Sequence, residues 1–154
     1  MKTKKILFAL LALFLISCAV QRQKSVDRLF SDFSKEKGVT RVGIGKFAMT
    51  VTGLFTDAKG VKGVEVLSFG ECKNSVVERL NKAIASLNDE SYETLASVNE
   101  ETKHTKILMK SDDEFVRELV ILTTGNDPAM IRIKGNIKFS DIENIINKIK
   151  SSKE

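Results

Sequence analysis

The pattern of apolar and polar residues is clearest between Phe115 and Ile137. The segment 115–123 is entirely apolar from Leu119 to Leu122, as expected of a strand that is buried on both faces. Gly125-Asn126-Asp127-Pro128 then favours a turn. In the second strand Ala129, Ile131 and Ile133 fall on one face and Met130, Arg132 and Lys134 on the other, as expected of a strand that is covered on one face only. The pattern therefore predicts a β-hairpin at the centre of the core.

Three other segments have the periodicity of amphipathic helices. Ser25 is a potential N-cap for the first of them. The second begins with Ser75 and Glu78, and the third with Ser140 and Glu143, both matching the capping-box pattern S-x-x-E. The apolar stripes are Val26, Leu29, Phe30 and Phe33 in the first helix, Val76, Val77, Leu80, Ala83, Ile84 and Leu87 in the second, and Ile142, Ile145, Ile146 and Ile149 in the third.

Four more strands are expected at residues 39–44, 64–69, 92–98 and 103–110, the last two forming a hairpin. In that hairpin Thr105, Ile107 and Met109 should face the core. Residues 46–55 fit a strand by propensity and a helix by the spacing of their apolar residues. We expect a single α+β domain over residues 25–150, with a largely antiparallel sheet of about six strands and helices packed on one face. Residues 151–154 should form a frayed tail.

The first eighteen residues have the features of an export signal. Three lysines precede an apolar run at 6–16, which at 11 residues is shorter than the roughly 20 residues that a spanning helix needs. The sequence Leu15-Ile16-Ser17-Cys18 resembles the lipobox of bacterial lipoproteins. This resemblance implies cleavage after Ser17, a thioether link from Cys18 to diacylglycerol, and acylation of the new amino group by a fatty acid such as palmitate. The alternative is an ordinary secretory signal that is cleaved near Ala19.

The expected organisation is a signal peptide at 1–17, a tether at 18–24 and the domain after it. Ala19 rather than Asp follows Cys18, which resembles the sorting pattern for the outer membrane. No acidic run follows it, so we expect the lipid anchor to hold the protein facing the periplasm. If Cys18 carries the lipid, Cys72 has no cysteine to pair with.

The net charge does not indicate nucleic-acid binding. The whole chain carries a formal charge of +5, but three lysines leave with the signal peptide. The mature chain then has 22 basic and 20 acidic residues, a charge of +2, which gives no strongly basic surface.

Several short motifs resemble the bacterial envelope family DUF4252, a domain of unknown function. They are Val26-Asp27-Arg28-Leu29-Phe30, Glu118-Leu119-Val120-Ile121-Leu122, Gly125-Asn126-Asp127-Pro128 and Ile133-Lys134-Gly135-Asn136-Ile137. The resemblance extends from Val26 to Lys148 and favours a short helix at 46–55. It implies an exported, often lipid-anchored protein of Gram-negative envelopes, and it assigns no activity and no functional residues.

Two residues are candidates for chemistry. His104, the one histidine in the chain, could act as a base or a metal ligand, or could be an ordinary surface residue of a strand. Cys72 precedes a predicted helix, whose N-terminal dipole could lower the pKa of a thiol. The structural alternative for Cys72 is a half-buried residue of the core.

Three charged or glycine-containing motifs have structural alternatives as well. Gly43-Ile44-Gly45-Lys46 lacks the full spacing of a phosphate-binding loop, and Asp112-Asp113-Glu114 lacks the alternation of a calcium site, so the second is expected to be a solvated turn. Arg132, Lys134 and Lys138 form a basic face that could contact anionic lipid, or could protect an edge strand from aggregation.

Together these observations predict a lipid-anchored envelope protein that acts as a non-enzymatic binding or sensing module at the outer membrane, with an envelope protein as its partner. The alternative is a periplasmic enzyme or small-ligand binder that uses a cleft between the sheet and the helices. The sequence assigns no catalytic, cofactor-binding or metal-binding residue.

Overall fold

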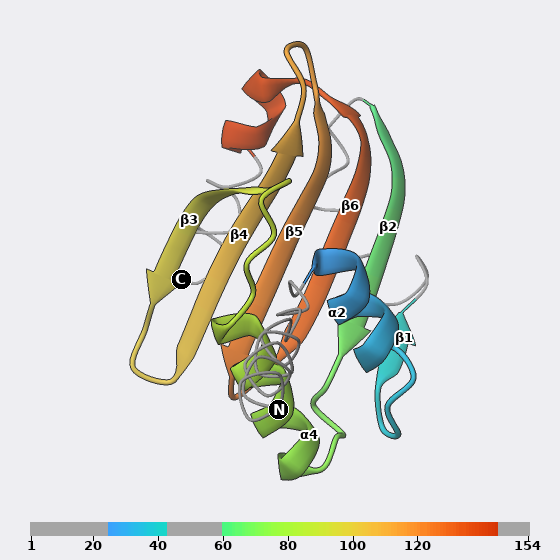
Figure 1. Cartoon of the computed structure of the whole chain (residues 1–154), viewed down its shortest axis with the longest axis vertical. Coiled ribbons are helices and arrows are strands. Elements are labelled where there is room, and N and C mark those ends of the chain that lie inside the picture. The colour runs from blue at the N-terminus through green and yellow to red at the C-terminus, as the bar shows by residue number, and fades with distance from the viewer. Residues whose placement is uncertain (1–24, 43–59, 145–154) are drawn as a thin grey trace, which may run out of the picture.

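The computed structural model describes residues 25–42 and 60–144, in which six strands form one antiparallel sheet (Figure 1). The strand order is β1-β2-β6-β5-β4-β3. The strands are β1 (Thr40–Val42), β2 (Val61–Ser68), β3 (Glu93–Asn99), β4 (Lys103–Ser111), β5 (Val116–Gly125) and β6 (Ala129–Ile137). The helices are α2 (Val26–Phe33) and α4 (Asn74–Ala85), and residues 139–144 are also helical. The predicted single α+β domain with a largely antiparallel sheet is confirmed.

The predicted central hairpin is confirmed as β5 and β6, the two middle strands of the sheet. Leu119, Val120 and Leu122 of β5 are fully buried. The expectation that β6 is covered on one face only is wrong, because Met130 and Arg132 are buried on the face expected to be open. Figure 1 shows why: α2 crosses in front of β6 and β2.

Apolar residues cover both faces of the sheet and form two clusters. One cluster joins α2 and α4 to the near face, and it includes Phe30, Phe33, Phe69, Leu80, Leu108, Val120, Leu122 and Met130. The other lies on the opposite face, and it includes Ile107, Met109, Leu119, Ile121, Ile133, Ile137 and Ile142. The expected packing of helices on one face describes α2 and α4. Ile142, in the helical segment 139–144, packs on the other face, because β4, β5 and β6 present apolar residues there as well.

The two described helices differ in how they begin. Ser25 caps α2 as predicted, since its Oγ accepts a hydrogen bond from the backbone N–H of Arg28 at 3.3 Å. The capping box predicted at Ser75 and Glu78 is wrong: α4 starts one residue earlier, Lys73 occupies the N-cap, and no side chain caps the helix. The apolar face of α4 is nevertheless buried as predicted.

Several boundaries differ from the predicted ones by a few residues. Strand β2 begins three residues before the predicted start at Val64, and β5 continues to Gly125. Thr105, Ile107 and Met109 of β4 are buried as predicted. The signal peptide at 1–17, the tether at 18–24, the motif Gly43–Lys46, the ambiguous segment 46–55 and the tail at 151–154 lie outside the described residues.

Gly125, the last residue of β5, occupies a position that only glycine fits. Its φ angle is +102°, in the left-handed region that side chains disfavour. A Cβ atom built on Gly125 would lie 1.9 Å from the carbonyl oxygen of Thr102, next to the start of β4. The tight approach of these two chain segments therefore depends on the missing side chain.

We expect Gly125→Ala to lower the free energy of unfolding by about 2 kcal/mol or more, because a left-handed conformation alone costs a non-glycine residue about 1–3 kcal/mol. Urea denaturation followed by circular dichroism measures the change. Gly70→Ala is the matched control, since Gly70 has no positive φ and a Cβ there would meet no atom within 4 Å. Equal stability of the two variants would contradict the role of Gly125.

Candidate functional site

Arg132 is a buried cation on the face of β6 that α2 covers. Its side chain is only 7% exposed and contacts three carboxylates. Nη1 donates to Asp27 Oδ1 at 2.5 Å and lies 3.6 Å from Glu118 Oε1, while Nε lies 3.5 Å from Glu65 Oε2. The contact with Glu65 is ionic and lacks hydrogen-bond geometry, so the Nε–H has no hydrogen-bond partner. Arg132 thus connects α2, β2 and β5.

Aromatic residues complete the surroundings of Arg132. Its guanidinium lies 4.0 Å from the centre of the Phe30 ring, a cation–π contact that links it to α2 a second time. Tyr92 donates its hydroxyl proton to Glu118 Oε1 at 2.6 Å. Burial, followed by the hydrogen bond to Glu118 and the negative charges of Glu118 and Asp27, raises the pKa of Tyr92 far above its ordinary value. Tyr92 therefore remains a hydrogen-bond donor at any physiological pH.

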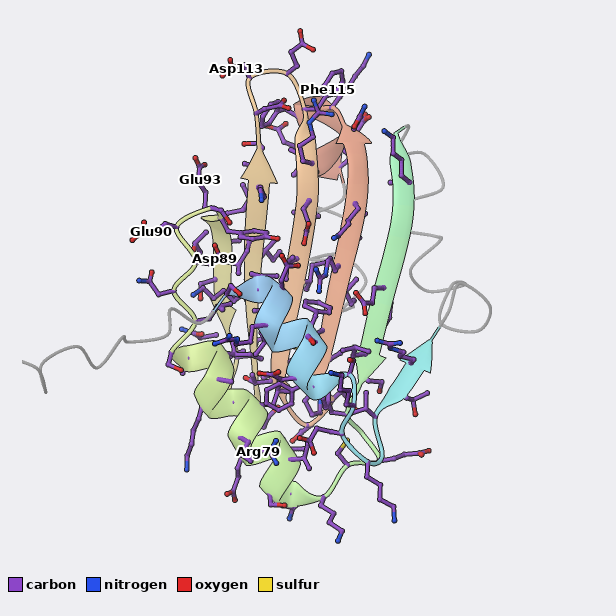
Figure 2. All side chains as sticks on the ribbon, turned by 45° about the vertical axis from the view of Figure 1, so that its right-hand side comes forward. Arg79, Asp89, Glu90, Glu93, Asp113 and Phe115 are labelled. Carbon is purple, nitrogen blue, oxygen red and sulfur yellow. The ribbon has the colours of Figure 1, made fainter. Side chains whose placement is uncertain are left out.

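The N-terminus of α2 is held to the loop between α4 and β3. The backbone N–H of Val26 donates to Asp89 Oδ2 at 2.9 Å, and Ser91 donates its N–H and its hydroxyl proton to Asp89 Oδ1. Figure 2 shows Asp89 close to the start of α2, while Glu90 and Glu93 project into solvent. Burial raises the pKa of Asp89, but the hydrogen bonds from Ser91 and Val26 and the charge of Lys110 outweigh it, so the pKa is lowered overall.

The second helix is fixed to α2 by contacts at its outer face. Arg79 of α4, labelled in Figure 2, forms an ion pair with Glu36 and lies 5.8 Å from the centre of the Phe33 ring. The rings of Phe33 and Phe69 meet edge to face at 6.0 Å. These contacts set the position of α4 over the sheet.

A cavity of about 320 Å³ lies between α4 and strands β3, β4 and β5. This volume falls at the lower end of the range typical of small-ligand sites, about 300–1,000 Å³. Its walls combine apolar residues with amide, hydroxyl, imidazole and ammonium groups. The lining residues are Asn81, Ile84 and Ala85 of α4, Ser97 of β3, His104, Thr105 and Lys106 of β4, and Leu122 and Thr124 of β5.

The strand register brings the polar residues of the cavity together. Lys106 pairs with Ser97 on one side and with Leu122 on the other, which places the three side chains in one row across the sheet. His104 pairs with Thr124 in the next row, about 7 Å away along the strand. On α4, Asn81, Ile84 and Ala85 occur at spacings i, i+3 and i+4 and therefore share one helical face.

Two groups of the cavity lack partners among the described residues. Lys106 belongs to none of the ion pairs that these residues form, although its side chain is partly buried. Asn81 has a buried Oδ1 that accepts no hydrogen bond. No carboxylate lines this cavity, so its polar wall carries positive charge. The arrangement suits a ligand that brings a negative charge and a hydrogen-bond donor.

His104 is the sequence candidate that the structure places at this cavity. It is exposed, and its Nδ1 lies 3.1 Å from Asn99 Oδ1. In the tautomer that carries its proton on Nδ1, the ring donates to this amide oxygen and Nε2 is left for other partners. The local sequence gave no signal for Lys106 or Asn81, because the elements that surround them are brought together only by folding.

The other sequence candidates have structural roles. Cys72 packs against the apolar cluster under α4, and burial, with the nearby charges of Glu36 and Glu71, raises the pKa of its thiol. The helix dipole therefore does not activate it, and the core alternative holds. Asp112 accepts hydrogen bonds from the N–H groups of Glu114 and Phe115, which confirms the predicted turn.

The basic face predicted on the last strand is divided by the structure. Lys134 is exposed and lies 3.6 Å from Glu118, Lys138 is exposed after β6, and Arg132 is buried. Protection of an edge strand is wrong for this face, because β6 lies in the middle of the sheet. In residues 25–42 and 60–144 no group of three or more His, Cys, Asp or Glu residues could hold a metal ion.

Comparison with protein families identifies the domain. The family model described as "Domain of unknown function (DUF4252)" matches residues 33–145, which include all six strands, α4 and every residue of the cavity. The chain belongs to the DUF4252 family. No curated protein and no solved structure matches the chain significantly. The DUF4252 family description carries no activity, so the chemistry must be argued from the site itself.

In this DUF4252 domain Arg132 and Glu118 line neither the cavity described above nor a smaller one of about 90 Å³ beside Asp89. The Arg132 guanidinium is buried and surrounded by its partners, although Asp27 reaches solvent, whereas the cavity under α4 is an accessible space. The cavity is therefore the candidate functional site, and the Arg132 cluster supports the structure around it.

None of the helices in the described part of the chain is long and apolar enough to span a membrane.

We expect Arg132→Met to lower the free energy of unfolding by about 3–5 kcal/mol, because it leaves the buried Glu118 with the exposed Lys134 as its one remaining cation among the described residues. Chemical denaturation of the variant measures the loss. The double variant Arg132→Met/Glu118→Gln should recover part of it, since no buried charge remains. Arg117→Met is the control: Arg117 pairs with Asp112 at an exposed turn, where removal of an ion pair changes stability little. Similar losses for Arg132→Met and Arg117→Met would contradict this role.

The lowered pKa of Asp89 makes its contribution to stability dependent on pH. The folded state binds the proton less readily than the unfolded state, so the contribution is present above about pH 4 and is lost as the pH falls through the folded pKa. Denaturation at pH 7 should show Asp89→Asn to be less stable than the wild type, and the difference should shrink below about pH 4. Glu90→Gln, at an exposed neighbouring position, should behave like the wild type at both pH values. A difference for Asp89→Asn that does not change with pH would contradict the assignment.

Proposed function

We propose that this protein is a lipid-anchored binding protein of the bacterial outer membrane that faces the periplasm, is not an enzyme, and takes its ligand in the cavity under α4. The anchor is supported by Leu15-Ile16-Ser17-Cys18, by the apolar run before it, and by Ala19 after it. Two or more acyl chains hold a protein on a membrane far more firmly than one chain does. Binding is supported by one observation above all, the cavity of about 320 Å³ with a cationic and partly apolar wall.

The anchor would place the cavity close to the membrane. Six residues lie between Cys18 and Ser25, and the seven residue-to-residue steps of an extended chain span at most about 25 Å. Helix α2 begins directly after Ser25 and is held by Asp89 and Arg132. A ligand of the cavity would therefore be met within a short distance of the inner leaflet of the outer membrane.

A small-molecule enzyme is the second candidate, and His104 on the wall of the cavity is the observation that favours it. A histidine that acts as a general base is usually oriented by a carboxylate or a backbone carbonyl. The Nδ1 of His104 lies against the amide oxygen of Asn99 instead, on the exposed surface. His104 therefore lacks the carboxylate or backbone carbonyl that would orient a general base, and we prefer binding to catalysis.

Radiolabelled palmitate tests the anchor in cells that express the full chain. We expect the wild type to incorporate label and to fractionate with the outer membrane, and Cys18→Ala to lose both the label and the membrane association. Cys72→Ala is the matched control and should keep both, because its thiol lies in the folded domain. An unlabelled wild type would overturn the anchor, and a labelled protein in the inner membrane would overturn the sorting step.

A further inference from the structure

The cavity under α4 has on one wall an ammonium group that forms no ion pair with the residues described, 25–42 and 60–144. Lys106 lies in the middle of β4 and borders both the cavity of about 320 Å³ and the smaller one of about 90 Å³. The carboxylate of Asp89 in the smaller cavity already accepts hydrogen bonds from Val26 and Ser91 and forms no ion pair with Lys106. A partly buried ammonium group is stabilised by an opposite charge that replaces lost water. The charge that fits is a carboxylate brought by the ligand.

The opposite wall has an acceptor that needs a donor. Asn81 Oδ1 is buried without a hydrogen bond, and such atoms are rare in folded proteins unless a water molecule or a ligand completes them. A carboxylate has no proton to donate at neutral pH, so it can satisfy Lys106 but not Asn81. The ligand must therefore carry an N–H or O–H group in addition to its carboxylate.

The remaining wall is apolar. Ile84 and the exposed Ala85 of α4 provide a surface for an aliphatic group, and the fully buried Leu122 of β5 also borders the cavity. The volume accommodates one amino-acid residue with its acyl group better than a long chain. An N-acylated amino acid with an aliphatic side chain combines a carboxylate, an adjacent N–H and an apolar group within this volume.

We infer that the cavity binds an N-acylated amino acid with an aliphatic side chain, as a free small molecule or as the C-terminal residue of a peptide. Lys106 pairs with the carboxylate, Asn81 Oδ1 accepts the amide N–H, and the side chain packs on Ile84 and Ala85. The inference rests on the proposed use of this cavity as a ligand site and adds the class of ligand.

Methyl NMR of the full chain in detergent micelles tests the inference with N-acetyl-leucine as the probe. We expect saturable shifts of the Ile84 and Leu122 methyl signals and none of Ile142, which lies on the opposite face of the sheet. N-acetyl-leucinamide, which lacks the charge, should bind at least tenfold more weakly. 4-Methylpentanoate keeps the carboxylate and side chain but lacks the N–H, and it should also bind more weakly.

Two variants assign the contacts. Lys106→Met should weaken binding of N-acetyl-leucine at least tenfold, and Lys110→Met is the matched control, because Lys110 lies on the same face of β4 over the Tyr92 ring and should bind as the wild type does. Asn81→Ala should weaken N-acetyl-leucine and leave 4-methylpentanoate unchanged. If Lys106→Met fails to fold, the comparison of acid and amide on the wild type still decides the charge requirement.

Each outcome separates the ligand class from the proposed use of the cavity. Equal binding of the acid and the amide, or shifts with N-acetyl-leucinamide alone, would overturn the carboxylate and leave the cavity as a ligand site. Shifts with no member of the panel would overturn both. An Asn81→Ala variant that binds every probe as the wild type does would mean that Asn81 holds a water molecule only. An acetylated tripeptide ending in leucine distinguishes the sources: tighter binding than N-acetyl-leucine indicates a peptide terminus, and absence of binding indicates the free acid.

Discussion

The fold depends on how the guanidinium group of Arg132 is neutralised inside the protein. A buried cation without partners would cost several kcal/mol, and three carboxylates from α2, β2 and β5 surround this one. Because those carboxylates come from elements far apart in the chain, the charge is satisfied only when the elements are assembled together. Phe30 adds a second contact from the same helix. Arg132 therefore specifies where α2 lies on the sheet, in addition to the apolar stripe that drives its burial.

The position of α2 determines that of α4, and α4 forms the roof of the cavity. Asp89 receives the first N–H of α2, while Glu36 and Phe33 near its other end contact Arg79 of α4. Both ends of α2 are thus tied to α4 or to the loop that follows it. A displacement of α2 would move the side of the cavity that Asn81 and Ile84 supply. The Arg132 cluster and the cavity under α4 are thus connected through α2 and α4, although Arg132 and Glu118 do not line the cavity.

The sequence was sufficient for elements whose burial follows from their own periodicity. The apolar run in β5 and the stripe of α2 predicted strand and helix correctly, because few alternatives bury such patterns. The burial of Arg132 could not be predicted from the sequence. The pattern along a strand shows which residues share a face, but not whether another element covers that face. Ser75 and Glu78 do not form a capping box, because the box requires the serine at the N-cap. The N-cap is Lys73, and Asn74 already has helical geometry. Lys106 and Asn81 had no local signal, because a cavity between distant elements leaves no spacing in the sequence.

Arg132 and Lys106 lie on the same face of the sheet, one row of residues apart, and the protein treats the two cations in opposite ways. Arg132 contacts three carboxylates and is covered by α2, so its charge is neutralised within the structure. Lys106 borders a cavity whose lining contains no acid, and the nearest carboxylate of the adjoining cavity is already committed to α2. A protein gains no stability from a partly buried charge that it leaves unpaired. The contrast within one sheet face is the physical reason to look for function at Lys106 and for stability at Arg132.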